Sequence, residues 1–179
     1  DLPSHIRSEG HADLRGGGIH SGRLTAPLVA SAGLIHNLKK KLGFEVFSQV
    51  STIGKINAKP IRLKPSSNIT DAMKITNCKD EKAAEKMYTL IKSTSEMGDS
   101  IGSTVEVIIM GLPIGVGEPW FDGLEPILSR ALMAIPAARA IEFGEGVNAV
   151  KMHGSEHNDS WIDDEGVIKI SEEGDGALG

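Results

Sequence analysis

The sequence is poor in cysteine and in aromatic residues, and each shortage argues against a class of protein. Its single cysteine, Cys78, cannot form a disulfide within the chain, and no histidine lies close to it in the polar stretch ITNCKD. Aromatic residues make up 4% of the 179 residues, which is few for a surface that stacks single-stranded nucleic acid. We therefore expect neither an intrachain disulfide nor a stacking platform.

Long apolar runs and a surplus of positive charge are also missing. No apolar run reaches the roughly 20 residues that cross a bilayer, and residues 1–20 lack a signal-peptide pattern, so we expect a cytoplasmic protein without membrane contact. The formal net charge of −5 provides no general basic field for nucleic acid. We expect small molecules or other protein chains as partners, and any anion site has to be local.

The sequence does contain the composition of a globular domain, in which helical and strand patterns alternate. An apolar stripe from Leu24 to Leu42 predicts one helix that begins near Ser21 to Ala26, packs through one face and stops at Gly43. Other patterns predict strands over 44–53, 104–111 (buried) and 140–146, and helices over 81–95 and 122–134, the last capped by Asp122. No regular pattern is found in residues 1–20 or in the tail from 151. Residues 57–80 predict a loop with at most a short edge strand. The alternation favours an α/β or α+β layered fold in a single domain, residues 1–179.

Three consecutive glycines, Gly16, Gly17 and Gly18, stand between Arg15 and Arg23 and lead into the first predicted helix. Their N–H groups carry no neighbouring side chain and can point at a ligand, and a helix N-terminus favours negative charge. The two guanidinium groups match a carboxylate or a phosphate. The pattern predicts an anion site, although a flexible turn with two solvated arginines explains the same spacing.

A second run, HGSEH at 153–157, has the letters of the inverted zinc-peptidase motif. Zinc chemistry would need His153 and His157 on one helical face. Gly154 and Ser155 lie between them and no apolar stripe supports a helix, so we predict a turn and not a zinc hydrolase.

Five segments resemble chorismate synthases: GHAD at 10–13, RGGGIHSGRLTAP at 15–27, the long stretch 98–146, HGSEHND at 153–159 and GDGALG at 174–179. They span nearly the whole chain, and the long stretch is highly specific. The resemblance implies an α+β fold of the β-α-β sandwich type with two similar halves, assembled as a homotetramer.

The activity implied by the resemblance is that of a lyase. Such enzymes convert 5-enolpyruvylshikimate 3-phosphate to chorismate and phosphate by a 1,4-elimination in the shikimate pathway, which leads to the aromatic amino acids. They require reduced FMN although the reaction has no net redox change. NADPH or an external flavin reductase would supply the electrons.

The resemblance also implies site residues. His11, in GHAD, matches a catalytic histidine near the reduced flavin that is thought to donate a proton to it, and Arg23 matches an arginine that faces the anionic substrate. The implied flavin contacts are Ile19, His20, Ser21, Pro136, Ala137 and Gly179.

The chain departs from the family pattern in several places. Ile19 and His20 stand where the family has an arginine and a serine, and Leu24 stands where it has a glutamate. Asp13 ends one motif and begins the next, where the family has a loop of about ten residues. The family's N-terminal portion, with a second catalytic histidine and substrate arginines, and its C-terminal portion are absent. We therefore expect a longer protein; for a chain of only 179 residues, a non-catalytic anion-binding or assembly module is the alternative.

Overall fold

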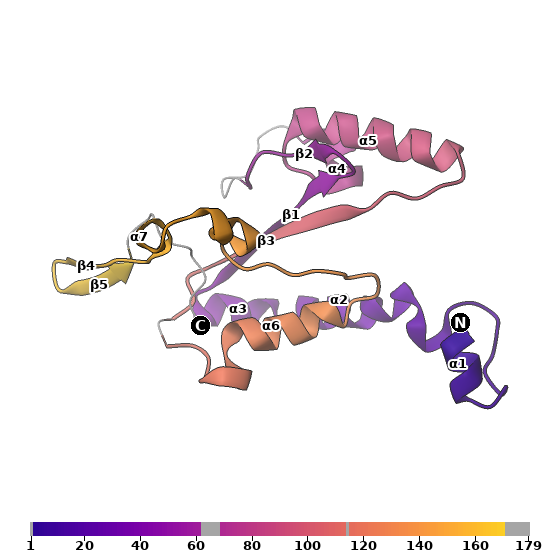
Figure 1. Cartoon of the computed structure of the whole chain (residues 1–179), viewed down its shortest axis with the longest axis horizontal. Helices are drawn as coiled ribbons and strands as arrows, with labels where there is room; N and C mark the ends of the chain where they lie inside the picture. The colour runs from indigo at the N-terminus through magenta and orange to yellow at the C-terminus, as the bar shows by residue number, and fades with distance from the viewer. Residues whose placement is uncertain (1, 62–68, 114, 171–179) are drawn as a thin grey trace. The chain divides into compact units, whose positions relative to one another are not determined.

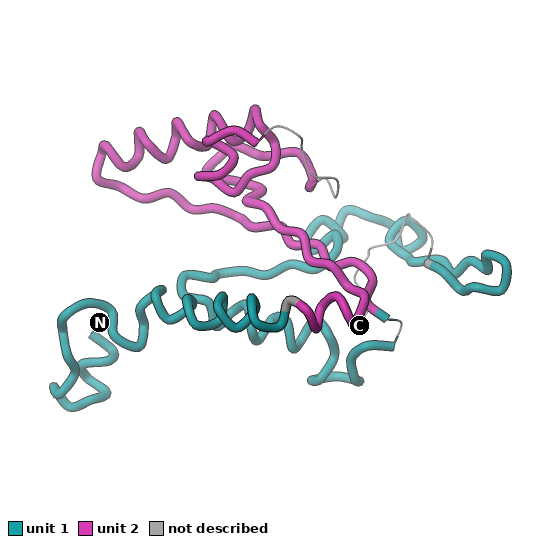
Figure 2. The backbone as a smooth tube through the Cα atoms, turned by 180° about the vertical axis from the view of Figure 1, so that it is seen from behind, with its two compact units in different colours: residues 1–35, 113–179 teal, residues 36–112 magenta. Residues whose placement is uncertain are grey.

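The computed structural model describes residues 2–61, 69–113 and 115–170. The chain divides into two compact units: unit 1 comprises residues 1–35 and 113–179, and unit 2 comprises residues 36–112 (Figure 2). Helices and antiparallel strands occupy separate stretches of each unit, as predicted for an α+β fold (Figure 1). The single domain over 1–179 stays a prediction. No helix among the described residues is long and apolar enough to span a membrane.

Unit 2 is built on a three-stranded antiparallel sheet. Strand β1 (Glu45–Ile53) lies in the centre, with β2 (Ile56–Asn57) on one side and β3 (Ser103–Met110) on the other. The register between β1 and β3 shifts between Val50 and Thr52, as in a β-bulge. Both long strands are confirmed, but β3 is not the buried strand that its apolar run predicted, because no residue along it is buried.

Two helices complete unit 2 and enclose its core. Helix α5 (Glu81–Glu96) packs on α4 (Asp71–Thr76). The sequence predicted α5 but not α4. The side chains buried between these helices and β1 belong to Ile53, Ala72, Met73, Cys78, Ala83, Ala84 and Met87. Burial raises the pKa of the Cys78 thiol, so this cysteine stays protonated and unreactive at neutral pH.

A buried amide, that of Gln49, joins the parts of unit 2. Its side chain is 2% exposed, and its Nε2 donates to the Lys59 carbonyl and to Glu106 Oε2, both at 2.9 Å. Its Oε1 accepts from the Lys79 N–H at 3.2 Å, and Glu106 Oε2 also accepts from the Ile61 N–H at 3.2 Å. One side chain thus connects β1, β3, the segment after β2 and the segment that leads into α5.

Helix α5 begins at a well-defined cap. Asp80 Oδ1 accepts from the Lys82 and Ala83 N–H groups, and Oδ2 accepts from the Lys59 N–H at 3.1 Å. Partial burial raises the pKa of this carboxyl, but the three N–H donors outweigh burial and hold its pKa below the usual range. The ionised form of Asp80 is therefore the one that stabilises the helix start.

Unit 1 consists of short helices and one hairpin. In β4 (Trp161–Asp164) and β5 (Val167–Ile170), the strands pair antiparallel through a two-residue turn with Glu165 and Gly166 both at positive φ. The helical elements are α1 (Leu2–Arg7), η1 (Gly18–His20), η2 (Gly22–Thr25), α2 (Ala26–Leu34), η3 (Trp120–Asp122), α6 (Leu124–Met133), η4 (Gly146–Lys151) and α7 (Gly154–His157).

The predicted helix from Ser21 to Leu42 is wrong in one respect, because the chain forms two α-helices there. Helix α2 ends at Leu34, and α3 (His36–Leu42) follows after Ile35. The Ser31 hydroxyl donates to the Pro27 carbonyl at 2.8 Å, a bond back along the helix that often bends it. The predicted stop is confirmed, since Gly43 has φ +80°. The predicted packed face is not confirmed, because α2 buries no residue.

Other predictions of local structure also need correction. Residues 140–146 form no strand, and Gly123, rather than Asp122, caps α6. Helices α1 and α4 and the β4–β5 hairpin lie in segments without a predicted element. In α4 the signals were the caps: Thr70 Oγ1 accepts from the Met73 N–H, and Asn77 ends the helix with φ +53°.

We predict that Gln49→Leu lowers the free energy of unfolding by about 1–3 kcal/mol, because it leaves the Lys59 carbonyl and the Lys79 N–H without their partner and removes one of the donors to Glu106. Urea denaturation monitored by circular dichroism at 222 nm measures this change. Thr89→Ala, an exposed substitution on α5, serves as the control and should change stability by less than about 0.5 kcal/mol. Equal effects of the two substitutions would contradict a structural role for the amide.

A second prediction concerns Asp80 and pH. Since the pKa of Asp80 is lowered on folding, its contribution is fully present above the unfolded aspartate pKa of about 3.9 and is lost as the pH falls through the lower folded pKa. Asp80→Asn keeps a capping side chain without a charge. The wild type should therefore be more stable than the variant at pH 6, and the difference should shrink below about pH 4. Denaturation series across this range test the prediction; a pH-independent difference would contradict it.

Candidate functional site

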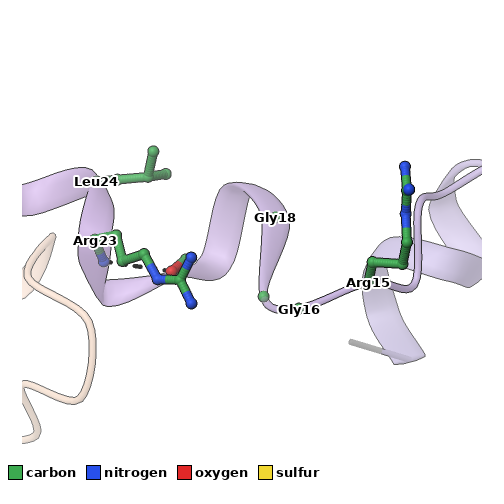
Figure 3. A pocket seen from close by; sticks show the side chains of 7 residues that line it. Arg15, Gly16, Gly18, Arg23 and Leu24 are labelled. Atoms are coloured by element: carbon green, nitrogen blue, oxygen red, sulfur yellow. Dashed lines mark hydrogen bonds between the residues drawn. The ribbon is translucent and has the colours of Figure 1, made fainter.

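The glycine run and the start of the following helix form an open depression of about 460 Å³ in unit 1. Figure 3 shows the side chains that line it, all from one continuous segment. The lining residues are Arg15, Gly16, Gly17, Gly18, Ser21, Arg23 and Leu24. The site is therefore a product of local backbone conformation.

The conformation of this segment favours glycine at each position of the run. Gly16 and Gly18 have φ +86° and +52°, a region that side chains disfavour. A Cβ on Gly17 would lie 3.1 Å from Ser21 Cα. Within the described part of the chain, the N–H groups of Gly16 and Gly17 donate to no protein acceptor. Two backbone donors are thus available to an anion. This geometry suits the predicted anion site, which stays a prediction beside the alternative of a plain turn.

The two arginines of the depression differ in what they contact. The Arg15 guanidinium holds both oxygens of Asp13, with Nε to Oδ1 at 3.0 Å and Nη2 to Oδ2 at 2.9 Å. This pairing lowers the pKa of Asp13 and raises that of Arg15. Among the described residues, the Arg23 guanidinium makes no such contact, and Figure 3 shows it at the opposite end of the glycine run from Arg15. Arg23 is therefore the cation with its charge available to a ligand.

Ser21 has a structural role as well as a place in the depression. Its Oγ accepts from the Arg23 N–H at 3.3 Å and so caps the first turn of η2. The hydroxyl hydrogen remains able to donate to a ligand. Ser21 and Arg23 are the two predicted site residues that line the depression.

The other predicted residues lie outside this lining. His11, Ile19 and His20 are exposed and do not line the depression. Pro136 and Ala137 follow α6, and Ala137 has φ +70°, a strained conformation for a residue with a side chain. Gly179 lies outside the described residues. Leu24, which the sequence analysis noted as a departure from the family, contributes an apolar part of the lining.

The HGSEH run forms a single helical turn, α7, and the predicted turn without helix is wrong. The cause is a local cap, because Glu156 Oε2 accepts from the His153 N–H at 2.8 Å. That bond engages the carboxylate that a zinc hydrolase would use. Among the described residues, no three His, Cys, Asp or Glu side chains gather as a metal site.

The chain as a whole matches the family model for chorismate synthase over residues 1–179. It is 40% identical over 164 residues to the chorismate synthase of Aeropyrum pernix. That alignment covers 89% of this chain and 42% of the relative. The chorismate synthase of Methanopyrus kandleri is 40% identical over 178 residues, and the alignment covers 95% of this chain and 46% of that relative. A solved chorismate synthase structure superposes with a TM-score of 0.78 at 25% identity, over 95% of this chain and 55% of the other.

Fold and site together define an α+β protein with a local depression that is lined by the glycine run and two arginines. The chain belongs to the chorismate synthase family. It spans slightly less than half the length of the curated relatives that it matches, from 42% for the Aeropyrum pernix protein to 49% for that of Pyrococcus abyssi.

The difference between the two arginines predicts the response of the depression to an anion. Arg23→Gln should weaken the binding of inorganic phosphate by about tenfold, since a charge-assisted hydrogen bond is lost. Arg15→Gln should weaken it less, because Asp13 already neutralises Arg15. Phosphorus NMR line broadening, titrated with the protein, measures both constants. Arg130→Gln on α6 is the matched control; a loss as large as that of Arg23→Gln would show that binding is not local to the depression.

Proposed function

We propose that the protein to which this chain belongs is a lyase that eliminates phosphate from 5-enolpyruvylshikimate 3-phosphate and releases chorismate. The match of all 179 residues to the family model supports this proposal most directly. The depression at the glycine run adds a physical reason, since an available guanidinium and free backbone N–H groups suit a substrate that carries phosphate and carboxylates. As elsewhere in the family, the pathway served would be that to the aromatic amino acids.

Reduced FMN is the cofactor that we propose, and the residues of the depression fit part of it. Two glycine N–H groups and the Ser21 hydroxyl are donors that could hold an anionic or carbonyl group, and Leu24 provides an apolar surface. When bound, a reduced flavin would supply an electron-rich ring to the elimination of phosphate. Ile19, His20, Pro136, Ala137 and Gly179 remain proposed flavin contacts.

Two side chains have proposed roles in the chemistry. Arg23 would hold the anionic substrate and stabilise the charge of the departing phosphate, for which its uncommitted guanidinium is suited. His11 would hold and donate a proton, because an imidazole ring can carry a proton on either nitrogen. The exposure of His11 leaves its ring accessible to a ligand.

The setting of the reaction is also a proposal. We expect a homotetramer in the cytoplasm, with electrons for the flavin supplied by NADPH or by a separate flavin reductase. The alternative, a non-catalytic module that binds anions, would keep the depression and lack turnover.

Turnover tests the proposed function directly. The protein should release phosphate from 5-enolpyruvylshikimate 3-phosphate under anaerobic conditions when reduced FMN is present. His11→Ala should lower kcat by about 10²-fold or more, as expected for the loss of a proton donor. Arg23→Gln should raise KM and lower kcat together, because the same guanidinium contacts the substrate before and during phosphate departure.

A control variant and one contradicting result complete this test. Lys86→Ala, on the exposed side of α5, should leave both constants unchanged. Phosphate binding without any turnover would contradict the lyase and support the non-catalytic module.

A further inference from the structure

Asp13 does not line the depression of unit 1, yet it contacts a residue that does. Its carboxylate accepts hydrogen bonds from both the backbone and the side chain of Arg15. The Arg15 N–H donates to Oδ1 at 2.9 Å, and the guanidinium Nε lies 3.0 Å from Oδ1 and 3.2 Å from Oδ2. Nη2 donates to Oδ2 at 2.9 Å. Asp13 therefore orients one of the two cations of the depression.

The pairing occupies one edge of the Arg15 guanidinium. An arginine offers its N–H groups in a planar fork, and carboxylates or phosphates bind best to the parallel N–H groups of one edge. Asp13 holds the edge formed by Nε and Nη2, so the N–H groups left for a ligand are those that include Nη1. Asp13 is thus an internal anion that competes with an external one for the same cation.

The net charge at the depression depends on this carboxylate. Two of the lining side chains are charged, and both are arginines. Because Asp13 pairs with Arg15, the two positive charges and one negative charge leave a single net positive charge for a ligand. The energy of an ion near a fixed charge is proportional to the charge of the ion. A dianion therefore loses twice as much from the presence of Asp13 as a monoanion does.

Both partners of the ion pair are exposed, with side-chain exposures of 91% for Arg15 and 61% for Asp13. An ion pair between exposed side chains contributes little to the stability of a fold, and salt screens it. Removing the charge of Asp13 should therefore leave the fold intact. The main consequence of the pair is the charge that it leaves at the depression.

We propose that Asp13 determines the specificity of the depression: by pairing with Arg15 it disfavours doubly charged anions relative to singly charged ones. The inference rests on the proposed function, in which the same depression holds an anionic substrate, and it adds a residue that controls how tightly phosphate is held there. Asp13 acts through Arg15 and is a positioning residue, not a catalytic one.

Asp13→Asn tests this role, because the amide oxygen can still accept from the Arg15 N–H while the negative charge is removed. NMR line broadening at low ionic strength measures the binding of acetate and of inorganic phosphate, the latter at about pH 8, where it is mainly a dianion. The variant should bind acetate about threefold and phosphate about tenfold more tightly than the wild type. Asp13→Glu keeps the charge and should stay within about twofold of the wild type for both anions.

A double-substitution cycle shows whether Asp13 acts through Arg15. In the Asp13→Asn background, Arg15→Gln should weaken phosphate binding by about tenfold, because Arg15 then has its full charge available. In the wild-type background the same substitution should weaken it less. Equal losses in the two backgrounds would overturn the role of Asp13 as a positioning residue.

Asp71→Asn is the matched control. Asp71 is also exposed and pairs with Lys74 at 3.1 Å, but it lies in unit 2, so its substitution changes the net charge of the protein equally and leaves the depression untouched. Binding of both anions should be unchanged in this control. The proposal is overturned by the same gain in Asp71→Asn, by equal gains for acetate and phosphate in Asp13→Asn, or by no gain at all.

The role of Asp13 and the lyase activity fail in different experiments. Anion binding requires neither flavin nor turnover. Unchanged phosphate affinity in Asp13→Asn would refute the role of Asp13 even if the wild type releases phosphate from its substrate. A protein that shows the expected affinity changes without turnover would refute the lyase and leave the role of Asp13 established.

Discussion

The pairing of β1 with β3 is the constraint on which the rest of unit 2 depends. It joins residues that lie 50 to 65 positions apart in the chain and places Gln49 directly opposite Glu106. From that position the buried amide reaches the segment after β2 and the segment before α5, where Asp80 also holds Lys59. A slip of one residue in the register would turn Gln49 to the other face of the sheet and leave these backbone groups unpaired.

Unit 1 depends on a different kind of constraint, the conformation of consecutive residues. Its depression comes from one segment, whose shape is set by two glycines at positive φ and by the Ser21 cap. This shape needs no contact with a segment that is distant in the sequence.

The electrostatics of the depression follow from a single ion pair. Asp13 binds Arg15 through both carboxylate oxygens and leaves Arg23 as the cation available to a ligand. The two arginines are equivalent in charge but differ in their contacts, because a carboxylate lies two residues from Arg15. The proposed substrate contact by Arg23, first implied by the family resemblance, gains a physical reason from this asymmetry.

Local patterns in the sequence were enough to predict β1, β3 and α5, since periodicity and caps lie within a few residues. Its motifs also predicted the family, which the family model confirms, whereas the anion site at the glycine run stays a prediction. Tertiary structure alone decided that Gln49 is buried and that β3 is exposed, whereas Arg15 pairs with a carboxylate only two residues away. The apolar stripe from Leu24 to Leu42 predicted a packed face, but α2 buries no residue. Burial depends on segments that are distant in the sequence, and no local pattern encodes them.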